Sequence, residues 1–425
     1  MTAVAEPNLY DVAIVGAGYV GVPLAATFAE AGQRALLVDV RSDVIEALNR
    51  GESHIEDVSN DRLAPLVSGG RLVATTDYEQ VKQARAILIA VGTPLSKQRE
   101  PDLSAIESVG RSLAPVLQRE QVVVLESTTW PGTTREVLQP ILEQGSGLKA
   151  GEDFYLAMSP ERVDPGREDW TTKTTPKVVG GIGPESTRAA AEVYRAAIDT
   201  VHEVSTPEAA ELTKLLENIY RAVNIALVNE LAQLCDRMEI DVWEVVEAAG
   251  TKPFGFSSFK PGPGLGGHCI PIDPFYLTWK AREFDFSTRF IELAGEVNNN
   301  MPYFCRSLIS QALNHGAHKS VSGSRILILG VAYKPDIGDW RETPAEKLIH
   351  LLQNAGAEVA YHDPFVPQFD GMDSAPLEPE AYDCVAIVTN HTTIDYADVV
   401  RRGNVIVDFR NATKGHEIDG KVWKL

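Results

Sequence analysis

The sequence contains few cysteines, and they do not form metal-binding or redox pairs. Four occur in 425 residues, at Cys235, Cys269, Cys305 and Cys384, all far apart in the chain. A disulfide framework or a zinc site needs cysteines in closely spaced sets, so we expect neither, and no bound metal. Scattered free thiols are typical of a reducing compartment, which predicts a cytoplasmic protein.

Long apolar runs and clusters of basic residues are also missing. No apolar stretch approaches the roughly 18 residues that a membrane-spanning helix needs, and the first residues do not resemble a signal peptide. The net charge is −20, which disfavours nucleic acid and anionic membranes as partners. An anionic ligand would therefore need lysines and arginines gathered locally.

Strand and helix patterns alternate in two separate parts of the chain. Residues 9–206 contain short β-branched runs separated by helical stretches, and the alternation returns after about residue 320. Continuous apolar strands separated by helices predict parallel sheets covered on both faces. We therefore predict an α/β fold in which two Rossmann-like doubly wound domains are joined by a central helical domain. The expected boundaries are 1–205, 206–315 and 316–425.

A long helix is predicted to open the central part. Thr206, Pro207 and Glu208 supply a capping hydroxyl, a proline for the first helical position and an acid for the helix dipole. The helix should run towards Cys235. Its apolar residues are expected to share one face: Leu212, Leu215, Leu216, Ile219 and Val223.

The same helix carries a polar face. Glu211, Lys214 and Asn218 are spaced i, i+3 and i+7, so they lie on one side. Taken alone, such a stripe is compatible with an ordinary solvated helix surface.

A glycine pattern follows the first predicted strand. In "VAIVGAGYVG", Gly16, Gly18 and Gly21 lie between a strand and a helix, where glycines let the backbone approach a pyrophosphate. Asp39 ends the next strand and can accept hydrogen bonds from a ribose, which favours NAD over NADP. Arg41, two residues later, weakens that preference slightly.

Other polar residues follow predicted strands and should line the ligand crevice of a doubly wound sheet. In the first half these are Thr93, Thr128, Glu161 and Arg162. In the second half, Lys334, Arg341 and Arg410 follow strands that lack the glycine pattern. These cations could hold a second anionic ligand through their side chains, or they could be scattered solvated charges.

A glycine- and proline-rich loop, "PGPGLGGHCIPIDPFY" at 261–276, places Cys269 four residues before Asp273. Glycines allow close approach of another molecule, and prolines stiffen the loop. A buried, inert thiol is the simpler interpretation of this stretch alone.

In their order along the chain, these motifs resemble the nucleotide-sugar 6-dehydrogenases, the UDP-glucose/GDP-mannose dehydrogenase family. The resembling stretches run from about residue 9 to about residue 411: G-A-G-Y-V-G, V-G-T-P, S-T-T, S-P-E-R-V-D-P-G, E-L-T-K-L-L-E-N, G-G-H-C-I-P-I-D and Y-K-P-D-I-G-D-W-R-E. The resemblance implies oxidation of a sugar C6 alcohol to a carboxylate in two NAD-dependent steps. It also implies NAD on the N-terminal domain, a UDP-sugar on the C-terminal domain, and a homodimer or higher homo-oligomer formed through the central helices.

The resemblance also implies roles for individual residues. Cys269 is the nucleophile, Lys214, Asn218 and Asp273 surround the reacting carbon, and Thr128 and Glu161 hold the hydrolytic water or act as base. The candidate cofactor contacts are Gly16, Gly18, Tyr19, Val20, Gly21, Asp39, Arg41, Thr93, Thr128 and Arg341. The candidate substrate contacts are Glu161, Arg162, Val163, Lys214, Asn218, Lys260, Gly264, Gly266, Lys334 and Arg410.

The chemistry of a thiolate suits this reaction. Its addition to the aldehyde left by the first oxidation gives a tethered thiohemiacetal, which can donate the second hydride. Water then cleaves the resulting thioester. A cation at Lys214 would stabilise both the thiolate and the oxyanion, so Cys269 is expected to be reactive.

Two other functions fit parts of the sequence. A two-electron hydroxyacid dehydrogenase needs the lysine helix but neither the cysteine loop nor a third domain. A catalytically silent NAD-binding scaffold needs none of Cys269, Lys214 and Asp273.

The identity of the sugar rests on one short stretch. Residues 253–256, Pro-Phe-Gly-Phe, lack the arginine that the UDP-glucose branch of the family carries shortly before its glycine loop. Such an apolar wall suits an acetamido methyl, and Arg162 could supply a replacement donor. We therefore expect UDP-N-acetylglucosamine to be oxidised to its uronic acid; the alternatives are UDP-N-acetylmannosamine, UDP-glucose and dTDP-glucose.

Overall fold

The computed structural model describes residues 9–95, 100–163, 169–267 and 270–425, so Cys269 lies outside the described residues. The chain divides into two compact units. The first unit contains Met1–Glu217 and Trp279–Phe284, and the second unit contains Asn218–Thr278 and Asp285–Leu425. Helix α7 (Pro207–Met238) supplies residues to both units. The three domain boundaries expected from the sequence stay a prediction.

The first unit is built on an eight-stranded sheet with the order β3-β2-β1-β4-β5-β6-β7-β8. Neighbouring strands are parallel except β6 and β7, which are antiparallel. The sequence did not predict that reversal, nor the short strands β3 and β8. The strands are β1 (Tyr10–Val15), β2 (Ala35–Val38), β3 (Leu72–Thr75), β4 (Ala84–Ile89), β5 (Val122–Leu125), β6 (Tyr155–Met158), β7 (Lys177–Gly181) and β8 (Val201–Val204).

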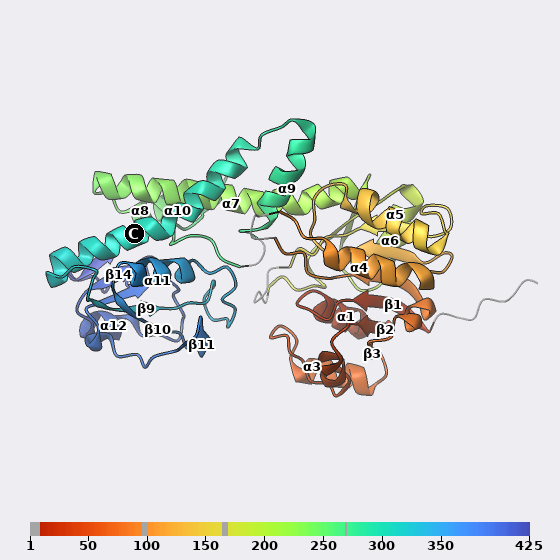
Figure 1. The fold of residues 1–425 in the computed structure, drawn as a ribbon, viewed down its shortest axis with the longest axis horizontal. Coiled ribbons are helices and arrows are strands. Elements are labelled where there is room, and N and C mark those ends of the chain that lie inside the picture. Colours follow the sequence, from red (N-terminus) through yellow and green to blue (C-terminus); the bar gives the residue numbers. More distant parts are fainter. Residues whose placement is uncertain (1–8, 96–99, 164–168, 268–269) are drawn as a thin grey trace, which may run out of the picture. The chain divides into compact units, whose positions relative to one another are not determined.

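Helices connect and cover these strands. The central strands β1, β4 and β5 are almost wholly buried, because their apolar side chains face packing partners on both sides of the sheet. Figure 1 shows α1 beside β1 and β2. The α-helices before α7 are α1 (Gly21–Glu30), α2 (Ser42–Asn49), α3 (Asn60–Ser68), α4 (Ser104–Leu113), α5 (Gln139–Ser146) and α6 (Pro184–Arg195).

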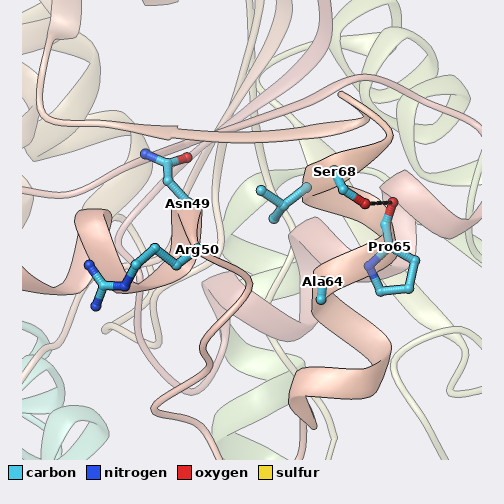
Figure 2. A pocket seen from close by; sticks show the side chains of 6 residues that line it. Asn49, Arg50, Ala64, Pro65 and Ser68 are labelled. Atoms are coloured by element: carbon cyan, nitrogen blue, oxygen red, sulfur yellow. Dashed lines mark hydrogen bonds between the residues drawn. The ribbon is translucent and has the colours of Figure 1, made fainter.

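A hollow of about 420 Å³ lies beside α2 and α3 in the first unit. Figure 2 shows its lining, which comprises Asn49, Arg50, Ala64, Pro65, Val67 and Ser68. The Asn49 side chain is hydrogen-bonded to the backbone of Ala74. Its Nδ2 donates to the Ala74 carbonyl at 2.8 Å, and its Oδ1 accepts the Ala74 N–H at 3.0 Å. Because its polar groups serve structural contacts, we assign this hollow no ligand.

The second unit contains a five-stranded parallel sheet with the order β10-β9-β13-β14-β15. Its strands are β9 (Arg325–Leu329), β10 (Glu358–His362), β13 (Cys384–Ile387), β14 (Ile406–Asp408) and β15 (Val422–Lys424), and β11 (Gln368–Phe369) and β12 (Met372–Asp373) form a separate pair. The helices are α8 (Val242–Gly250), α10 (Arg289–Ala312), α11 (Pro344–Asn354) and α12 (Tyr396–Arg402), with α9 (Asp273–Ala281) divided between the units. This architecture confirms the predicted fold class.

Helix α7 has two apolar faces rather than the one expected. Leu215 and Ile219 are buried, whereas Leu212 and Leu216 are 42% and 63% exposed. Exposed leucines continue along the helix at Leu227, Leu231 and Leu234. An apolar stripe of this length is typical of an interaction surface, and the expected homodimer stays a prediction. None of the helices in the described part of the chain is long and apolar enough to cross a membrane.

Candidate active site

The glycine turn after β1 fits a dinucleotide. Gly16 has φ +110°, and a Cβ there would lie 2.2 Å from the carbonyl oxygen of Ala90. A Cβ on Gly21 would lie 1.8 Å from the Gly16 carbonyl oxygen, so the protein's own backbone requires both glycines. At Gly18, by contrast, a Cβ would meet nothing within 4 Å. That open side, at the N-terminus of α1, suits the approach of a pyrophosphate.

Asp39 lies beside this turn as expected. Its Oδ2 accepts the Ala17 N–H at 2.7 Å, and its Oδ1 accepts the Arg41 N–H at 3.0 Å. Burial alone would raise the pKa of Asp39, but these hydrogen bonds and the Arg41 guanidinium hold it below its usual range. The carboxylate is therefore ionised and can accept ribose hydroxyls. Tyr19, which follows Gly18 in the glycine turn, has an exposed side chain.

Replacing Asp39 by alanine should weaken NAD use without abolishing it. Hydrogen bonds to a charged acceptor contribute about 1.5–3 kcal/mol, so we expect KM for NAD to rise about 10- to 100-fold while NADP is affected less. Steady-state kinetics with both cofactors measures this. Asp43→Ala, an exposed acid in the first turn of α2, is the control, and an unchanged KM for NAD in Asp39→Ala would contradict the assignment.

The two threonine loops at the ends of β4 and β5 lie together. Thr93 Oγ1 donates to the Thr128 carbonyl oxygen at 2.8 Å. Ser127 Oγ donates to the Val91 carbonyl at 2.7 Å and accepts the Val91 N–H at 3.0 Å. The carboxyl ends of β4 and β5 therefore form one continuous rim, and its expected role in lining the ligand crevice stays a prediction.

Glu161 lies on the same unit, fixed by its own backbone neighbours and by a buried lysine. Its Oε1 accepts the N–H groups of Arg162 and Val163, each at 2.7 Å, and its Oε2 accepts Lys177 Nζ at 3.2 Å. Burial would raise the pKa of Glu161, but Lys177, the Val163 N–H and the charge of Lys214 lower it overall. Glu161 is thus an ionised carboxylate with a fixed orientation.

Lys177 and its second partner, Glu126, are polar residues that sequence reasoning missed. Lys177 Nζ lies 2.5 Å from Glu126 Oε2, and their side chains are 4% and 0% exposed. A sequence signal existed: Glu126 directly follows the apolar run of β5, and Lys177 begins β7. Charges within buried runs are stable only when paired.

The polar face of α7 is buried rather than solvated. Glu211, Lys214 and Asn218 are 1%, 8% and 4% exposed. Lys214 forms no ion pair or hydrogen bond with any residue that the structure describes. A buried ammonium group without such a partner is poised to receive an anionic or oxygen-rich ligand.

Glu211 anchors α7 to the loop that follows β5. Its carboxylate accepts the Gly132 N–H at 2.6 Å, the Thr134 N–H at 2.9 Å and the Thr134 hydroxyl at 2.8 Å. Burial outweighs these donors and raises the pKa of Glu211 to about 7. This contact places the start of α7 against the helical turn that begins at Thr134.

The raised pKa of Glu211 predicts a pH-dependent stability. The folded chain binds this proton more tightly than the unfolded chain, whose carboxyl titrates near 4.5. The carboxyl therefore favours folding most below about pH 4.5, and the contribution, about 3 kcal/mol in size, is lost as pH rises through about 7.

Urea unfolding at about pH 5 and about pH 8 should show this loss in the unmodified protein and not in Glu211→Gln. Glu208→Gln is the matched control on the same helix, because Glu208 pairs with Arg135 at 2.7 Å and its pKa is lowered. An equal pH dependence in all three proteins would exclude Glu211 as its source.

In the second unit, Asn218 and Asp273 are joined directly. Asn218 Nδ2 donates to Asp273 Oδ2 at 2.5 Å, and both residues are 4% exposed. Asp273 is the first residue of α9. The hydrogen bond orients the amide so that its oxygen faces away from the carboxylate.

Arg410, after β14, is the most isolated cation at the strand ends of the second sheet. Its Nε donates to the Val388 carbonyl at 2.7 Å, and it forms no ion pair within the described ranges. Burial lowers the pKa of Arg410 to about 10. A Cβ on Gly262 would lie 2.5 Å from Arg410 Nη1, so the glycine-rich loop passes directly over the guanidinium.

The remaining predicted contacts occupy different settings. Lys334 is half-buried, and Lys260 is exposed. Arg341 is held by Asp339, with Nη2 to Oδ2 at 2.6 Å, and its carbonyl accepts the Gly267 N–H at 3.0 Å.

The loop that contains Gly264 and Gly266 packs closely. A Cβ on Gly266 would lie 2.6 Å from Tyr333 Cβ, and Gly264 has φ +135° with Pro344 nearby. Close backbone packing therefore accounts for both glycines without any ligand.

Arg162 is committed to the protein. Its guanidinium donates to Glu217 Oε1 at 2.9 Å and to the Pro176 carbonyl at 2.6 Å. To donate to a sugar, as the sequence led us to expect, the Arg162 guanidinium would have to give up these hydrogen bonds.

The second sheet repeats the backbone arrangement of the first but closes its ribose position. Gly330 N donates to the carbonyl of His362, and the next two N–H groups donate to Asp363 Oδ2, as Ala17 does to Asp39. Asp363 also accepts His391 Nε2 at 3.0 Å and two further backbone N–H groups at Oδ1. With five donors already bound, Asp363 has no capacity for a ribose. The dinucleotide site is thus confined to the first unit.

No cluster of three His, Cys, Asp or Glu side chains suited to a metal occurs among the residues with described positions. Cys269, the expected nucleophile, lies outside them. Among the described residues of the first unit, Glu161 is hydrogen-bonded to Lys177 and is influenced by the charge of Lys214. In the second unit, Asn218 is hydrogen-bonded to Asp273.

Comparison with known proteins gives a consistent result along the whole chain. The NAD-binding domain of the UDP-glucose/GDP-mannose dehydrogenase family matches residues 10–198, the central domain matches 208–300, and the UDP-binding domain matches 327–415.

Named relatives cover nearly the full length. The chain is 37% identical to a UDP-N-acetyl-D-mannosamine dehydrogenase of Pyrococcus horikoshii, covering 95% of this chain and 96% of that protein. It is 34% identical to a UDP-N-acetyl-D-glucosamine 6-dehydrogenase of Pseudomonas aeruginosa, covering 90% of each. A solved structure of the P. horikoshii UDP-N-acetyl-D-mannosamine dehydrogenase has a TM-score of 0.89 over 97% of this chain and 98% of that one, at 35% identity. The chain is thus an NAD-dependent nucleotide-sugar dehydrogenase and belongs to the UDP-glucose/GDP-mannose dehydrogenase family.

Proposed function

We propose that the protein oxidises the C6 alcohol of a UDP-linked 2-acetamido sugar to a carboxylate. The balanced reaction is RCH₂OH + 2 NAD⁺ + H₂O → RCOO⁻ + 2 NADH + 3 H⁺. The observation that supports it most is Lys214, a cation that is 8% exposed and unpaired within the described chain. Such a group is suited to stabilise oxygen atoms that gain negative charge during the reaction.

Lys214 and Asn218 would act on the reacting oxygen. They lie one turn apart on α7, so both side chains leave the same side of the helix. Lys214 offers a positive charge. Asn218 offers the second N–H of its amide, whose other N–H is bound to Asp273. The glycine turn and Asp39 would hold NAD, which when bound would supply the hydride acceptor for both oxidations.

Cys269 would make the aldehyde a covalent intermediate. Its thiolate adds to the aldehyde carbon, giving a thiohemiacetal whose oxidation leaves a thioester. Water then attacks the thioester carbon, the C–S bond breaks, and the thiolate is regenerated. Glu161, with Thr128 on the neighbouring rim, is the group proposed to orient and deprotonate that water, and Asp273 is proposed to assist.

The second unit would bind the UDP group. Arg410, half-buried and without an ion pair in the described residues, is suited to a phosphate or another anionic group. Lys334 and Lys260 are further cations proposed for the substrate, and Arg341 is proposed to contact the cofactor. The exposed apolar stripe of α7 supports association of two copies through this helix.

An acetamido sugar is favoured by the segment before the glycine loop. Phe254 and Phe256 are 72% and 43% exposed, so this stretch presents apolar surface where a glucose-specific site is expected to place an arginine. Relatives named for N-acetylmannosamine and for N-acetylglucosamine both match the chain. Their sugars share the 2-acetamido group and differ in its configuration.

A panel of nucleotide sugars tests the proposal. We expect kcat/KM for UDP-N-acetylglucosamine to exceed that for UDP-glucose by about 10- to 200-fold, since one group in a pocket contributes about 1–3 kcal/mol to discrimination. UDP-N-acetylmannosamine should be the closer competitor. NADH absorbance at matched concentrations measures each rate, and a preference for UDP-glucose or dTDP-glucose would contradict the acetamido assignment.

A further inference from the structure

Glu161 contacts a buried ion pair, Lys177 with Glu126, to which the proposed reaction gives no role. Lys177 and Glu126 come from β7 and from the end of β5, and their side chains are 4% and 0% exposed. Isolated charges are costly to bury, and replacing such a pair by apolar residues is often neutral or stabilising. Stability alone is therefore a weak reason for placing two charges here.

The pair reaches Glu161 through Lys177. Lys177 Nζ lies 2.5 Å from Glu126 Oε2 and 3.2 Å from Glu161 Oε2. The other oxygen of Glu126 accepts the Tyr194 hydroxyl. The other oxygen of Glu161 accepts two backbone N–H groups at 2.7 Å. Both carboxylate oxygens of Glu161 thus accept hydrogen bonds. Among the described residues, Lys177 is the only one whose side chain donates to Glu161.

We propose that Lys177 is a positioning residue for Glu161, which it holds ionised and correctly oriented for hydrolysis of the thioester, with Glu126 as the counter-charge that permits its burial. This inference rests on the proposed function, in which Glu161 acts on the hydrolytic water. Lys177 itself contacts neither substrate nor cofactor in this account.

The surrounding charges support this division of roles. The titratable groups that interact with Glu161 in the described residues are Lys177 on β7, Glu126 after β5, Lys214 on α7 and, through Glu126, Tyr194 on α6. Burial would raise the pKa of Glu161, and the Lys177 charge is the largest influence that lowers it. Burial likewise raises the pKa of Glu126, and there it prevails despite Lys177. Of the two carboxyls on Lys177, Glu161 is therefore the one whose pKa is lowered overall.

Two substitutions separate positioning from a merely structural role. Lys177→Met removes the side-chain donor to Glu161, so the pKa of Glu161 should rise and its carboxylate should lose its fixed orientation. Hydrolysis should then slow about 10- to 100-fold at neutral pH. Glu126→Gln leaves the Lys177 charge in contact with Glu161, so hydrolysis should stay close to that of the unmodified protein. A structural ion pair would make both variants fail alike.

The readout is the thioester adduct, measured by intact-protein mass after rapid quenching, together with the NADH burst. With UDP-N-acetylglucosamine and NAD, Lys177→Met should give a burst of two NADH per site, then slow turnover. Its adduct should increase as pH is lowered. Lys177→Arg should restore turnover at least in part, because it keeps the charge. If Lys177→Met folds poorly, Glu126→Gln with Lys177→Met removes both charges and should show the same adduct.

Lys280→Met is the matched control. Lys280 is another buried lysine of the first unit, with Nζ 2.7 Å from both Glu136 and Glu283, and its loss should produce no adduct. Normal turnover of Lys177→Met, or an equal adduct in Glu126→Gln, would overturn the inference. If Glu161→Gln forms no adduct, Glu161 is not the base and the inference fails with that role. If the unmodified protein forms no NADH with any UDP-sugar, the proposed function fails instead.

Discussion

Replacing Cys269 by alanine is expected to abolish carboxylate formation, with a fall in rate of at least about a thousandfold. Without the thiolate no thiohemiacetal or thioester can form, and losses of this size are usual when a covalent nucleophile is removed. Product analysis by mass spectrometry measures the carboxylate directly. NAD binding should be unchanged, because the glycine turn and Asp39 belong to the first unit, and it serves as the control for folding.

Alkylation tests the same residue in the unmodified protein. Cys305 and Cys384 are fully buried, and burial raises the pKa of both thiols well above the usual range. Cys235 is 9% exposed. Iodoacetamide should therefore label Cys269 first, and UDP-sugar should protect it. Equal labelling of all four cysteines, or carboxylate made by Cys269→Ala, would contradict the nucleophile assignment.

Glu161→Gln is expected to trap the thioester. The amide keeps the size of the side chain but cannot accept a proton from water, so hydrolysis should slow by about 10²- to 10⁴-fold, while both oxidations continue. The intact chain should then gain the mass of the bound sugar nucleotide. Glu52→Gln, at an exposed glutamate paired with Arg50 at 2.7 Å, is the control.

The outcome also assigns the base. If Glu161→Gln turns over normally, the role passes to Asp273 or to Lys214 in its neutral form. The low pKa of Glu161 makes it a weak proton acceptor but guarantees the ionised form at neutral pH. A hydrolysis rate that is independent of pH above about 5 in the unmodified protein would agree with that state.

Local patterns in the sequence were sufficient for the fold class, the glycine turn and NAD. The glycines follow a strand and open a helix, and the structure shows backbone contacts that exclude a Cβ at Gly16 and Gly21. The strands β3 and β8 were missed because both are partly exposed and neither has the continuous apolar run of the central strands. The antiparallel pairing of β6 and β7 depends on the path of the connecting chain, which local pattern does not record.

At the site, the feature that the sequence could not predict was the pairing of charges that lie far apart in the chain. Glu126 and Lys177 are 51 residues apart, so no local pattern connects them. A buried strand that ends or begins with a charge indicates a partner without identifying it. The spacing on α7 did predict that Glu211, Lys214 and Asn218 share a face, but their burial depends on what packs there. For the apolar residues of the same helix, 3.6-residue periodicity could not tell a buried face from an exposed one.

The most direct test of the four-electron reaction is the number of NADH molecules formed per UDP-sugar consumed. With limiting UDP-N-acetylglucosamine and excess NAD, NADH absorbance and product mass can be measured on the same sample. We predict two NADH and one uronic acid for each sugar nucleotide, with no free aldehyde. One NADH per substrate would contradict the account and indicate a two-electron dehydrogenase.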